Sequence, residues 1–232
     1  VYGGYPEVIK TDDAETKNIV LKNIYETYVT KDIIELLKIT DVLKFRNIVG
    51  LLASQHAGLL NFERLASDSK SYYREVKRFI SVLEETYLVK LLRPYHKNIS
   101  TELKKNQKAY FLDIGLRNHI IKNFNELKYR PDKGQIAEGL ALSGLTSLLP
   151  DVEIKYWRTL GKAEVDFIIK IADKTIPIEM KYENFNKPEI SRSFLNFISK
   201  YKPEIGVVLT KDFWGEKEIG ATKVKFIPLC YV

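Results

Sequence analysis

Two carboxylates and a lysine lie close together near the C-terminal end of the chain: Asp166, Glu179 and Lys181. The runs around them read as two β-strands joined by a tight turn, and side chains along a strand alternate between its two faces. On the first strand Asp166 then shares a face with Glu164, and the apolar residues between and after them point the other way. On the second strand Glu179 and Lys181 share a face. Burying such charges is unfavourable unless they are paired or bind a metal ion, so the spacing predicts a polar cluster with one of these two roles.

These residue types suit metal-dependent hydrolysis of a phosphodiester. Carboxylate oxygens of Asp166 and Glu179, with the carbonyl oxygen of Met180, would hold Mg²⁺, which proteins bind through one or two carboxylates and a substrate phosphate. The metal ion lowers the pKa of a bound water and neutralises charge that develops on the phosphate. Lys181 would stabilise that charge or help to deprotonate the water. The alternative that the residues leave open is a solvated edge of a hairpin.

The segments on either side of this hairpin predict a mixed domain over residues 131–232. Apolar residues recur at helical spacing after Asp132, Pro150 follows the end of that run, and Glu138 lies in its second turn. The expected elements are a helix over 132–149, a strand over 152–158, the two strands of the hairpin, a helix from Pro188 to about Lys200 and a short buried strand over 205–210.

The spacing of Asp166, Glu179 and Lys181, with twelve residues between the first two, resembles the PD-(D/E)xK motif of restriction-endonuclease-like nucleases. The expected order α-β-β-β-α-β is also the core of their fold. The resemblance implies that Glu138, on the first helix, belongs to the catalytic group with Asp166, Glu179 and Lys181. Arg158, on the neighbouring strand, is a candidate contact to nucleic-acid phosphate. Val165 replaces the proline of the motif, a change that leaves the metal ligands in place.

The net charge of +7 is concentrated in the middle of the chain. Residues 1–40 carry 5 Lys and Arg against 7 Asp and Glu, residues 41–130 carry 17 against 9, and residues 131–232 carry 15 against 14. A local basic excess is the electrostatic footprint of binding to a phosphate backbone, although surface lysines kept for solubility give a similar excess.

Residues 41–130 predict a winged helix-turn-helix domain, from three amphipathic helices followed by two strands. Asn61 is the expected N-cap of the second helix, and Ser69 or Ser71 that of the third. The third helix of such a domain can enter the major groove while the wing touches phosphates, but winged helices also dock onto proteins. The expected helices cover 42–52, 62–66 and 72–87, and the strands cover 88–92 and 108–112. The candidate nucleic-acid contacts are Lys70, Ser71, Arg74, Lys77, Arg78, Lys104 and Lys105.

Composition excludes several classes of protein. The sequence has no run of eighteen apolar residues and no signal-peptide pattern, so we expect neither a membrane span nor a membrane partner. The single cysteine, Cys230, excludes an intrachain disulfide and favours a reducing, cytoplasmic setting.

Short motifs along the whole chain resemble the C-terminal region of prokaryotic, especially archaeal, AAA-type ATPases. They are Gly-Gly-Tyr-Pro-Glu-Val over 3–8, the expected winged helix, Tyr-Trp-Arg-Thr over 156–159, Glu-Val-Asp-Phe over 164–167 and Ile-Glu-Met-Lys over 178–181. The resemblance implies that the chain is a piece of a longer protein, in which residues 1–40 form a helical linker after an ATPase domain. The chain itself lacks the Gly-x-x-x-x-Gly-Lys-Ser/Thr pattern, so we expect it not to bind ATP.

We therefore expect an α/β (α+β) chain with an N-terminal helical segment, a winged helix-turn-helix and a restriction-endonuclease-like domain. Two functions stay open. One is an Mg²⁺-dependent nuclease attached to an ATPase. The other is a non-catalytic module that binds nucleic acid, in the first place DNA, or a protein, and regulates the ATPase. The long N-terminal helix is also a candidate surface for a homo-oligomer.

Overall fold

The computed structural model describes residues 1–96 and 106–232 and divides into two compact units. Unit 1 comprises Val1–Leu91 and Ala109–Pro131, and unit 2 comprises Leu92–Lys108 and Asp132–Val232. Residues 1–40 thus belong to the same unit as the three helices that follow them. Residues Leu92–Lys108, the last of which opens the strand Lys108–Phe111, belong instead to the unit that carries Asp166, Glu179 and Lys181.

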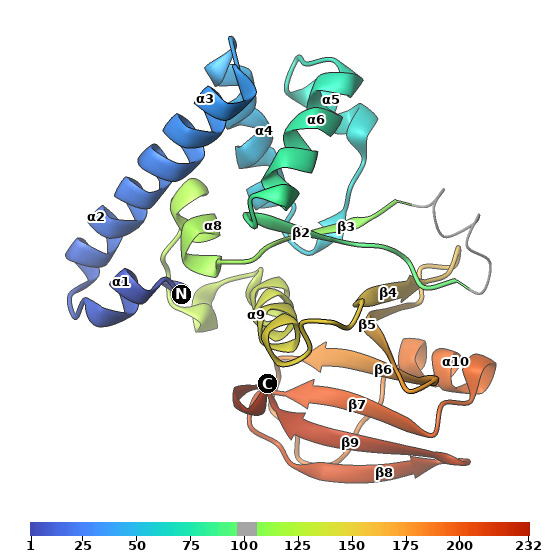
Figure 1. The fold of residues 1–232 in the computed structure, drawn as a ribbon. Helices are drawn as coiled ribbons and strands as arrows, with labels where there is room; N and C mark the ends of the chain where they lie inside the picture. Colours follow the sequence, from blue (N-terminus) through green and yellow to red (C-terminus); the bar gives the residue numbers. More distant parts are fainter. Residues whose placement is uncertain (97–105) are drawn as a thin grey trace. The chain divides into compact units, whose positions relative to one another are not determined.

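Unit 1 begins with the short helix α1 (Pro6–Lys10) and then one continuous helical run over 14–37, the long N-terminal helix that was expected (Figure 1). Asp13 caps the main part of this run, because its carboxylate accepts the Thr16 N–H at 2.7 Å. The middle of the run is π-helical, a backbone pattern that is rare in proteins. The elements are α1 (Pro6–Lys10), α2 (Ala14–Ile24), the π-helix η1 (Tyr25–Asp32) and α3 (Ile33–Leu37).

The next part of unit 1 contains the three expected helices and the two expected strands, with one short strand in addition. The side chain of Asn61 caps the second helix by accepting the Arg64 N–H at 2.9 Å, as expected. The expected serine cap of the third helix is wrong, because the Ser69 hydroxyl donates back to the Leu65 carbonyl at 2.6 Å. The elements are α4 (Val42–Ser54), β1 (Gly58–Leu59), α5 (Phe62–Asp68), α6 (Tyr73–Glu85), β2 (Val89–Leu92) and β3 (Lys108–Phe111), with sheet order β1-β3-β2.

Helix α6 buries one face in the core of unit 1 and leaves the other to solvent. Its buried residues, Val76, Phe79, Ile80 and Leu83, recur at the spacing of an amphipathic helix. Phe79 meets Phe45 of α4 edge to face, with ring centroids 5.3 Å apart. The basic residues of α6 therefore lie on the side away from this core.

The last helices of unit 1 are α8 (Ile114–Ile120) and the 3₁₀-helix η2 (Leu127–Tyr129), and α8 contacts the N-terminus of the chain. Asp113 caps α8 by accepting the Leu116 N–H at 2.7 Å, and the same carboxylate accepts the Gly4 N–H at 2.7 Å. One carboxylate thus ties the start of the chain to the start of α8.

Unit 2 contains the expected order α-β-β-β-α-β, followed by two further strands (Figure 1). Its last helix begins at Arg192 and not at Pro188 as expected, because the Ser191 hydroxyl caps it by accepting the Phe194 N–H at 3.1 Å. The elements are α9 (Lys133–Leu148), β4 (Lys155–Arg158), β5 (Glu164–Ile171), β6 (Lys174–Lys181), α10 (Arg192–Tyr201), β7 (Ile205–Thr210), β8 (Gly215–Ile219), β9 (Thr222–Pro228) and the 3₁₀-helix η3 (Leu229–Tyr231).

One six-stranded sheet organises unit 2, with strand order β4-β5-β6-β7-β9-β8. Strand β5 pairs antiparallel with β4 on one side and with β6 on the other. Strands β6, β7 and β9 run parallel to one another. Helix α10 covers one face, where its Phe194 and Phe197 pack with Trp157, Val165 and Phe226. The motif hairpin β5–β6 is therefore held in the sheet on both sides.

The close approach of the N-terminus to α8 gives a prediction about stability. A Cβ at Gly115 would lie 1.9 Å from the Tyr2 carbonyl oxygen. We expect Gly115→Ala to lower the free energy of unfolding by about 1–3 kcal/mol, as overpacking commonly does. Gly50→Ala, inside α4 with nothing within 4 Å, should instead raise it by about 0.5–1 kcal/mol. Urea unfolding of both variants measures this, and an unchanged Gly115→Ala would contradict the packing of Tyr2 on α8.

Candidate functional site

Strands β5 and β6 stop pairing at the point where the motif carboxylates lie. Their antiparallel register runs from Ile171–Lys174 to Phe167–Ile178. Beyond that pair β5 continues to pair with β4, and β6 with β7. Asp166 and Glu179 would form the next pair of the hairpin, and they sit instead where the two strands diverge. We call this place the fork.

A β-bulge aims Asp166 into the fork. The register between β4 and β5 shifts by one residue, so that Asp166 and Phe167 together face a single residue of β4. Such a bulge bends the strand and changes the direction of a side chain. The strict alternation expected for β5 does not hold here, since Val165 and Ile168 lie in the same core cluster.

Asp166 carries the most unusual carboxyl group of the site. Its Oδ2 accepts the Met180 backbone N–H at 2.8 Å, a donor that the diverging strand β5 no longer uses. Burial raises the pKa of Asp166 well above its ordinary value, and the negative charges of Glu138 and Glu179 raise it further against the opposing effect of Lys108. The fork therefore holds a carboxylate whose negative charge is poorly stabilised.

Glu179 and Lys181 form an ion pair beside Asp166, as their shared face predicts. Lys181 Nζ lies 3.1 Å from Glu179 Oε1, and the carboxylate of Glu179 is almost fully buried. Burial alone would lower the pKa of Lys181, but the charge and hydrogen bond of Glu179 outweigh it and raise that pKa. Lys181 is thus an ammonium at neutral pH.

Ser191 fixes the other side of Glu179, a role that sequence reasoning missed. Its hydroxyl donates to Glu179 Oε2 at 2.9 Å while it also accepts the Phe194 N–H of α10. The N-terminus of a helix favours nearby negative charge, so α10 supports this carboxylate. The available signal was a serine placed just before an apolar helical run, which sequence reasoning passed over in favour of Pro188.

Lys108 is the second residue that sequence reasoning missed. Its Nζ lies 2.6 Å from Glu138 Oε1 and 2.7 Å from Glu164 Oε1, and the residue is only 2% exposed. Burial would lower the pKa of Lys108, but the carboxylates of Glu138, Glu164 and Asp166 outweigh it and raise that pKa. The signal was a lysine that opens an otherwise apolar strand.

Glu164 and Arg158 belong to the same group of charged side chains as Lys108 and Glu138. Burial alone would raise the pKa of Glu164, but Lys108 and the hydrogen bonds from Lys108 and Arg158 lower it. Arg158 donates to Glu164 through Nη1, so its guanidinium is already engaged in unit 2. Its expected contact to phosphate stays a prediction.

The described side chains of the site comprise four carboxylates and three cations. Lys108 and Arg158 pair with Glu138 and Glu164, and Lys181 pairs with Glu179. Asp166 is left as the carboxylate whose only described hydrogen bond comes from a neutral amide. If all these groups are ionised, one negative charge is uncompensated, and it falls in the fork.

The donor set of the fork fits a single hard cation. Carboxylates of Asp166 and Glu179 and the carbonyl of Met180 are the oxygen ligands that Mg²⁺ prefers, and Mg²⁺ keeps several waters when one or two carboxylates hold it. Within residues 1–96 and 106–232, no group of three or more His, Cys, Asp and Glu side chains has the arrangement of a metal site. The fit therefore rests on two carboxylates and the uncompensated charge.

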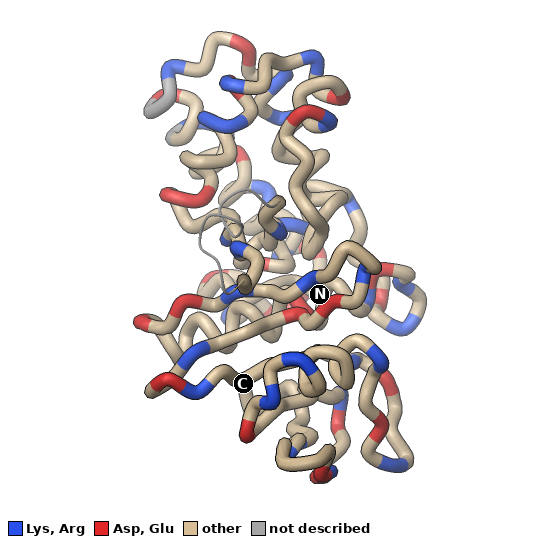
Figure 2. The backbone as a smooth tube through the Cα atoms, turned by 90° about the vertical axis from the view of Figure 1, so that its right-hand side faces the viewer, with Lys and Arg blue, Asp and Glu red and all other residues tan. Residues whose placement is uncertain are grey.

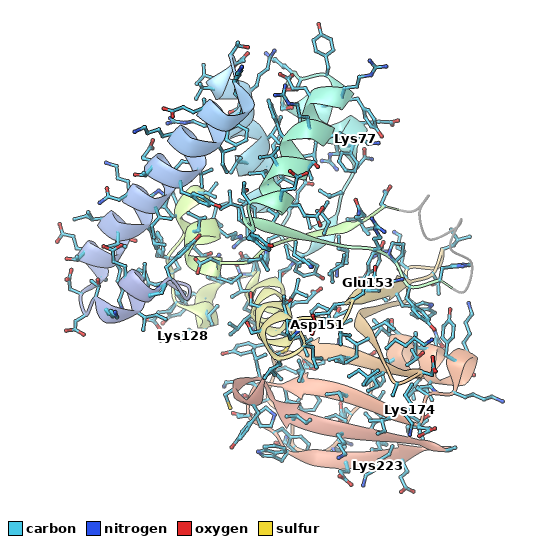
Figure 3. The ribbon with its side chains drawn as sticks, viewed as in Figure 1. Lys77, Lys128, Asp151, Glu153, Lys174 and Lys223 are labelled. Atoms are coloured by element: carbon cyan, nitrogen blue, oxygen red, sulfur yellow. The ribbon has the colours of Figure 1, made fainter. Side chains whose placement is uncertain are left out.

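The candidate nucleic-acid contacts of unit 1 gather on and before α6. Arg74, Lys77 and Arg78 are exposed on this helix, and Lys77 is labelled in Figure 3. Lys70 is exposed in the turn before it, whereas the Ser71 hydroxyl donates to the Ser69 carbonyl at 3.3 Å. Acidic and basic residues are interspersed along the rest of the chain (Figure 2). Lys104 and Lys105 lie outside the described residues.

The raised pKa of Asp166 predicts how stability depends on pH. Because the folded state holds this proton more tightly than the unfolded state, the stabilising effect of the carboxyl is present below its ordinary pKa. It is lost as pH rises through the raised, folded pKa. Asparagine can still accept the Met180 N–H but carries no charge. We therefore expect Asp166→Asn to melt at a higher temperature than wild type at pH 8 without added metal.

This gain should shrink as the pH falls from 8 toward about 4, the ordinary pKa of an aspartate, because the folded wild type takes up its proton at the raised pKa, above that value. Melting curves across that range measure it. Asp173→Asn, at a side chain 96% exposed in the β5–β6 turn, is the matched control and should show no such trend. If Asp166→Asn were less stable than wild type at every pH, this would contradict the conclusion that the negative charge of Asp166 destabilises the fold.

Comparison with known proteins assigns both halves of the chain to domains of unknown function. Residues 1–127 match the model of one such domain, DUF8612, and residues 133–230 match that of another, DUF4143. No helix within the described part of the chain is long and apolar enough to cross a membrane.

The similar curated proteins are all uncharacterized. A protein of Mycobacterium tuberculosis is 26% identical over 193 residues, which cover 82% of this chain and 43% of the relative. One of Haemophilus influenzae is 22% identical over 231 residues, covering 97% and 55%, and one of Methanocaldococcus jannaschii is 23% identical over 188 residues, covering 78% and 40%. The chain thus spans about half the length of the curated relatives it matches. Since the first domain match extends over more than half of the chain, the chain belongs to the DUF8612 family.

Proposed function

We propose that the fork of unit 2 is a Mg²⁺-dependent nuclease site that hydrolyses phosphodiesters, and that unit 1 binds the nucleic acid, in the first place DNA. The observation that carries the proposal is the uncompensated carboxylate of Asp166 beside the Glu179–Lys181 pair. A protein keeps such a destabilising group where activity needs it. The spacing of these three residues, which resembles the PD-(D/E)xK motif, supports the same conclusion.

Each residue of the fork has a separate task in this proposal. Mg²⁺ held by Asp166, Glu179 and the Met180 carbonyl would supply a water of lowered pKa and neutralise charge on the phosphate. Lys181, which pairs with Glu179, would stabilise the charge on the phosphate or help to deprotonate the water. Ser191 keeps the carboxylate of Glu179 oriented, as partners of metal ligands commonly do.

Unit 1 has the element order of a winged helix, and this supports a role in binding nucleic acid. Helices α4, α5 and α6 are followed by the hairpin β2–β3, with β1 added to the sheet. In such a domain the third helix enters the major groove. Helix α6 occupies that position and presents Arg74, Lys77 and Arg78 to solvent.

An ATPase domain in the same polypeptide is the proposed partner. The support is the resemblance of the chain's motifs to the C-terminal region of AAA-type ATPases. The curated relatives also leave about half of their length outside the match, which is room for a further domain. The homo-oligomer and the cytoplasmic location stay predictions.

The second candidate function is a non-catalytic module that binds DNA or a protein and regulates such an ATPase. It is favoured by the balance of charge in residues 131–232, where 15 Lys and Arg stand against 14 Asp and Glu. A domain that cuts nucleic acid benefits from a surface that attracts phosphate. This module would bind its partner equally well with or without Mg²⁺ and in Asp166→Asn.

Cleavage of a supercoiled plasmid tests the first candidate. We expect the wild type to nick the plasmid only with Mg²⁺ or Mn²⁺, and Asp166→Asn to lose about 100-fold or more in rate, because a metal ligand is gone. Ser191→Ala should lose about 10–100-fold, as other changes to partners of metal ligands do. Asp173→Asn, on the same hairpin, should cut like wild type. Nicking that survives Asp166→Asn would contradict the proposed site.

Binding to duplex DNA at several salt concentrations tests the role of α6. Replacing Arg74 and Lys77 by Ala should weaken binding and lower the steepness of its salt dependence by about one for each phosphate that the variant no longer neutralises. Lys128→Ala is the matched control, since this lysine lies on η2 of the same unit and is 63% exposed (Figure 3). An equal effect of both changes would indicate general attraction and not a defined surface on α6.

A further inference from the structure

Lys108 is a charged side chain whose position the proposed chemistry does not yet explain. It is 2% exposed, and its Nζ lies 2.6 Å from Glu138 and 2.7 Å from Glu164. The backbone just before it is fixed in unit 2, because the hydroxyl of Tyr156 donates to the carbonyl of Asn106. The ammonium is therefore held in place from its own strand as well as by its partners.

Two carboxylates bond this ammonium, and the charge of a third acts on it. Glu138 comes from α9, and Glu164 and Asp166 come from β5. Asp166 is near enough for Lys108 to act on its charge. Carboxylate oxygens that meet at one point, as those of Glu138 and Glu164 do, also suit a hard divalent cation, which takes oxygen ligands at distances of about 2.0–2.6 Å. The ammonium lies at a similar distance from both carboxylates.

We propose that the ammonium of Lys108 is a built-in cation, which holds Glu138 and Glu164 where a second divalent metal ion would otherwise bind. The nuclease site proposed above then takes one metal ion, at the fork, and not two. This inference rests on the proposed function only for the ion at the fork. Lys108 is a positioning residue in this arrangement, because it acts through the carboxylates it holds.

The charges explain why one cation can replace the other. A buried carboxylate needs a paired charge or a metal ion. Lys108 supplies one positive charge to Glu138, and it shares Glu164 with Arg158. Without Lys108, Glu138 would lose this ion pair and Glu164 would keep only that with Arg158, and the space of the missing side chain would lie between the two carboxylates. Mn²⁺ with its waters can occupy that space.

The number of Mn²⁺ ions bound per chain tests the proposal, by calorimetric titration together with the electron paramagnetic resonance of free Mn²⁺. We expect one ion for the wild type and two for Lys108→Ala. Adding Glu138→Gln to that variant should return the number to one, since the new site then lacks one of its ligands. Lys108→Arg keeps a cation and should bind one ion.

Lys174→Ala is the matched control. This lysine of β6 also lies 2.7 Å from a carboxylate, that of Glu204, but its side chain is 57% exposed (Figure 3). Its removal should leave the number of ions unchanged. Equal numbers of ions in wild type and Lys108→Ala would overturn the proposal for Lys108 and leave the nuclease proposal standing. No ion in the wild type with one ion in Lys108→Ala would support the proposal for Lys108 and overturn the metal ion at the fork, and with it the nuclease proposal.

Thermal stability gives a second reading that does not depend on counting ions. Lys108→Ala should melt below wild type without metal, because two half-buried carboxylates lose an ion pair. Saturating Mn²⁺ should raise its melting temperature by more than that of wild type, since an additional ion binds only the folded state. A variant that stays unfolded with Mn²⁺ present would also overturn the proposal, because no metal ion then replaces the ammonium.

Discussion

The need to neutralise buried carboxylates governs one end of the sheet in unit 2. Glu138, Glu164, Asp166 and Glu179 lie there, with Glu179 buried and the other three half-buried. An unpaired buried charge is so unfavourable that each of these groups needs a cation or several hydrogen-bond donors. Three carboxylates have a cation within the described structure, and Asp166 has only an amide. We infer that the missing charge comes from a metal ion.

Several local features of unit 2 serve this arrangement. The β-bulge in β5 includes Asp166, and where β5 and β6 diverge its carboxylate accepts the Met180 N–H. Ser191 links the first turn of α10 to Glu179. Lys108 reaches Glu138 and Glu164 from a strand that begins in unit 2 and continues in unit 1. Backbone irregularities and paired charges thus accompany the apolar packing at this end of the sheet.

Periodic patterns and caps made much of the fold predictable from the sequence. The order of helices and strands follows from apolar spacing, and Asn61 caps α5 because its side chain competes well for an unpaired N–H. The proximity of Glu179 to Lys181 follows from the alternation of a strand. These features depend on residues close together in the sequence.

The features that sequence reasoning missed depend on distant residues or on small shifts of register. Lys108 lies 30 positions before Glu138, and no local pattern joins the two. The bulge at Asp166 has no distinct residue signature. Pro188 and Ser191 both suit the start of a helix. In the structure the helix begins after Ser191, whose hydroxyl also donates to the distant Glu179.

The most direct measurement is a crystal structure with Mn²⁺, in which anomalous scattering locates the ion. One peak at the fork is expected, within bonding distance of carboxylate oxygens of Asp166 and Glu179 and of the Met180 carbonyl. No peak should lie between Glu138 and Glu164. A fork without metal at saturating Mn²⁺, with Asp166 still bonded only to the Met180 N–H, would contradict the metal centre and favour the non-catalytic module.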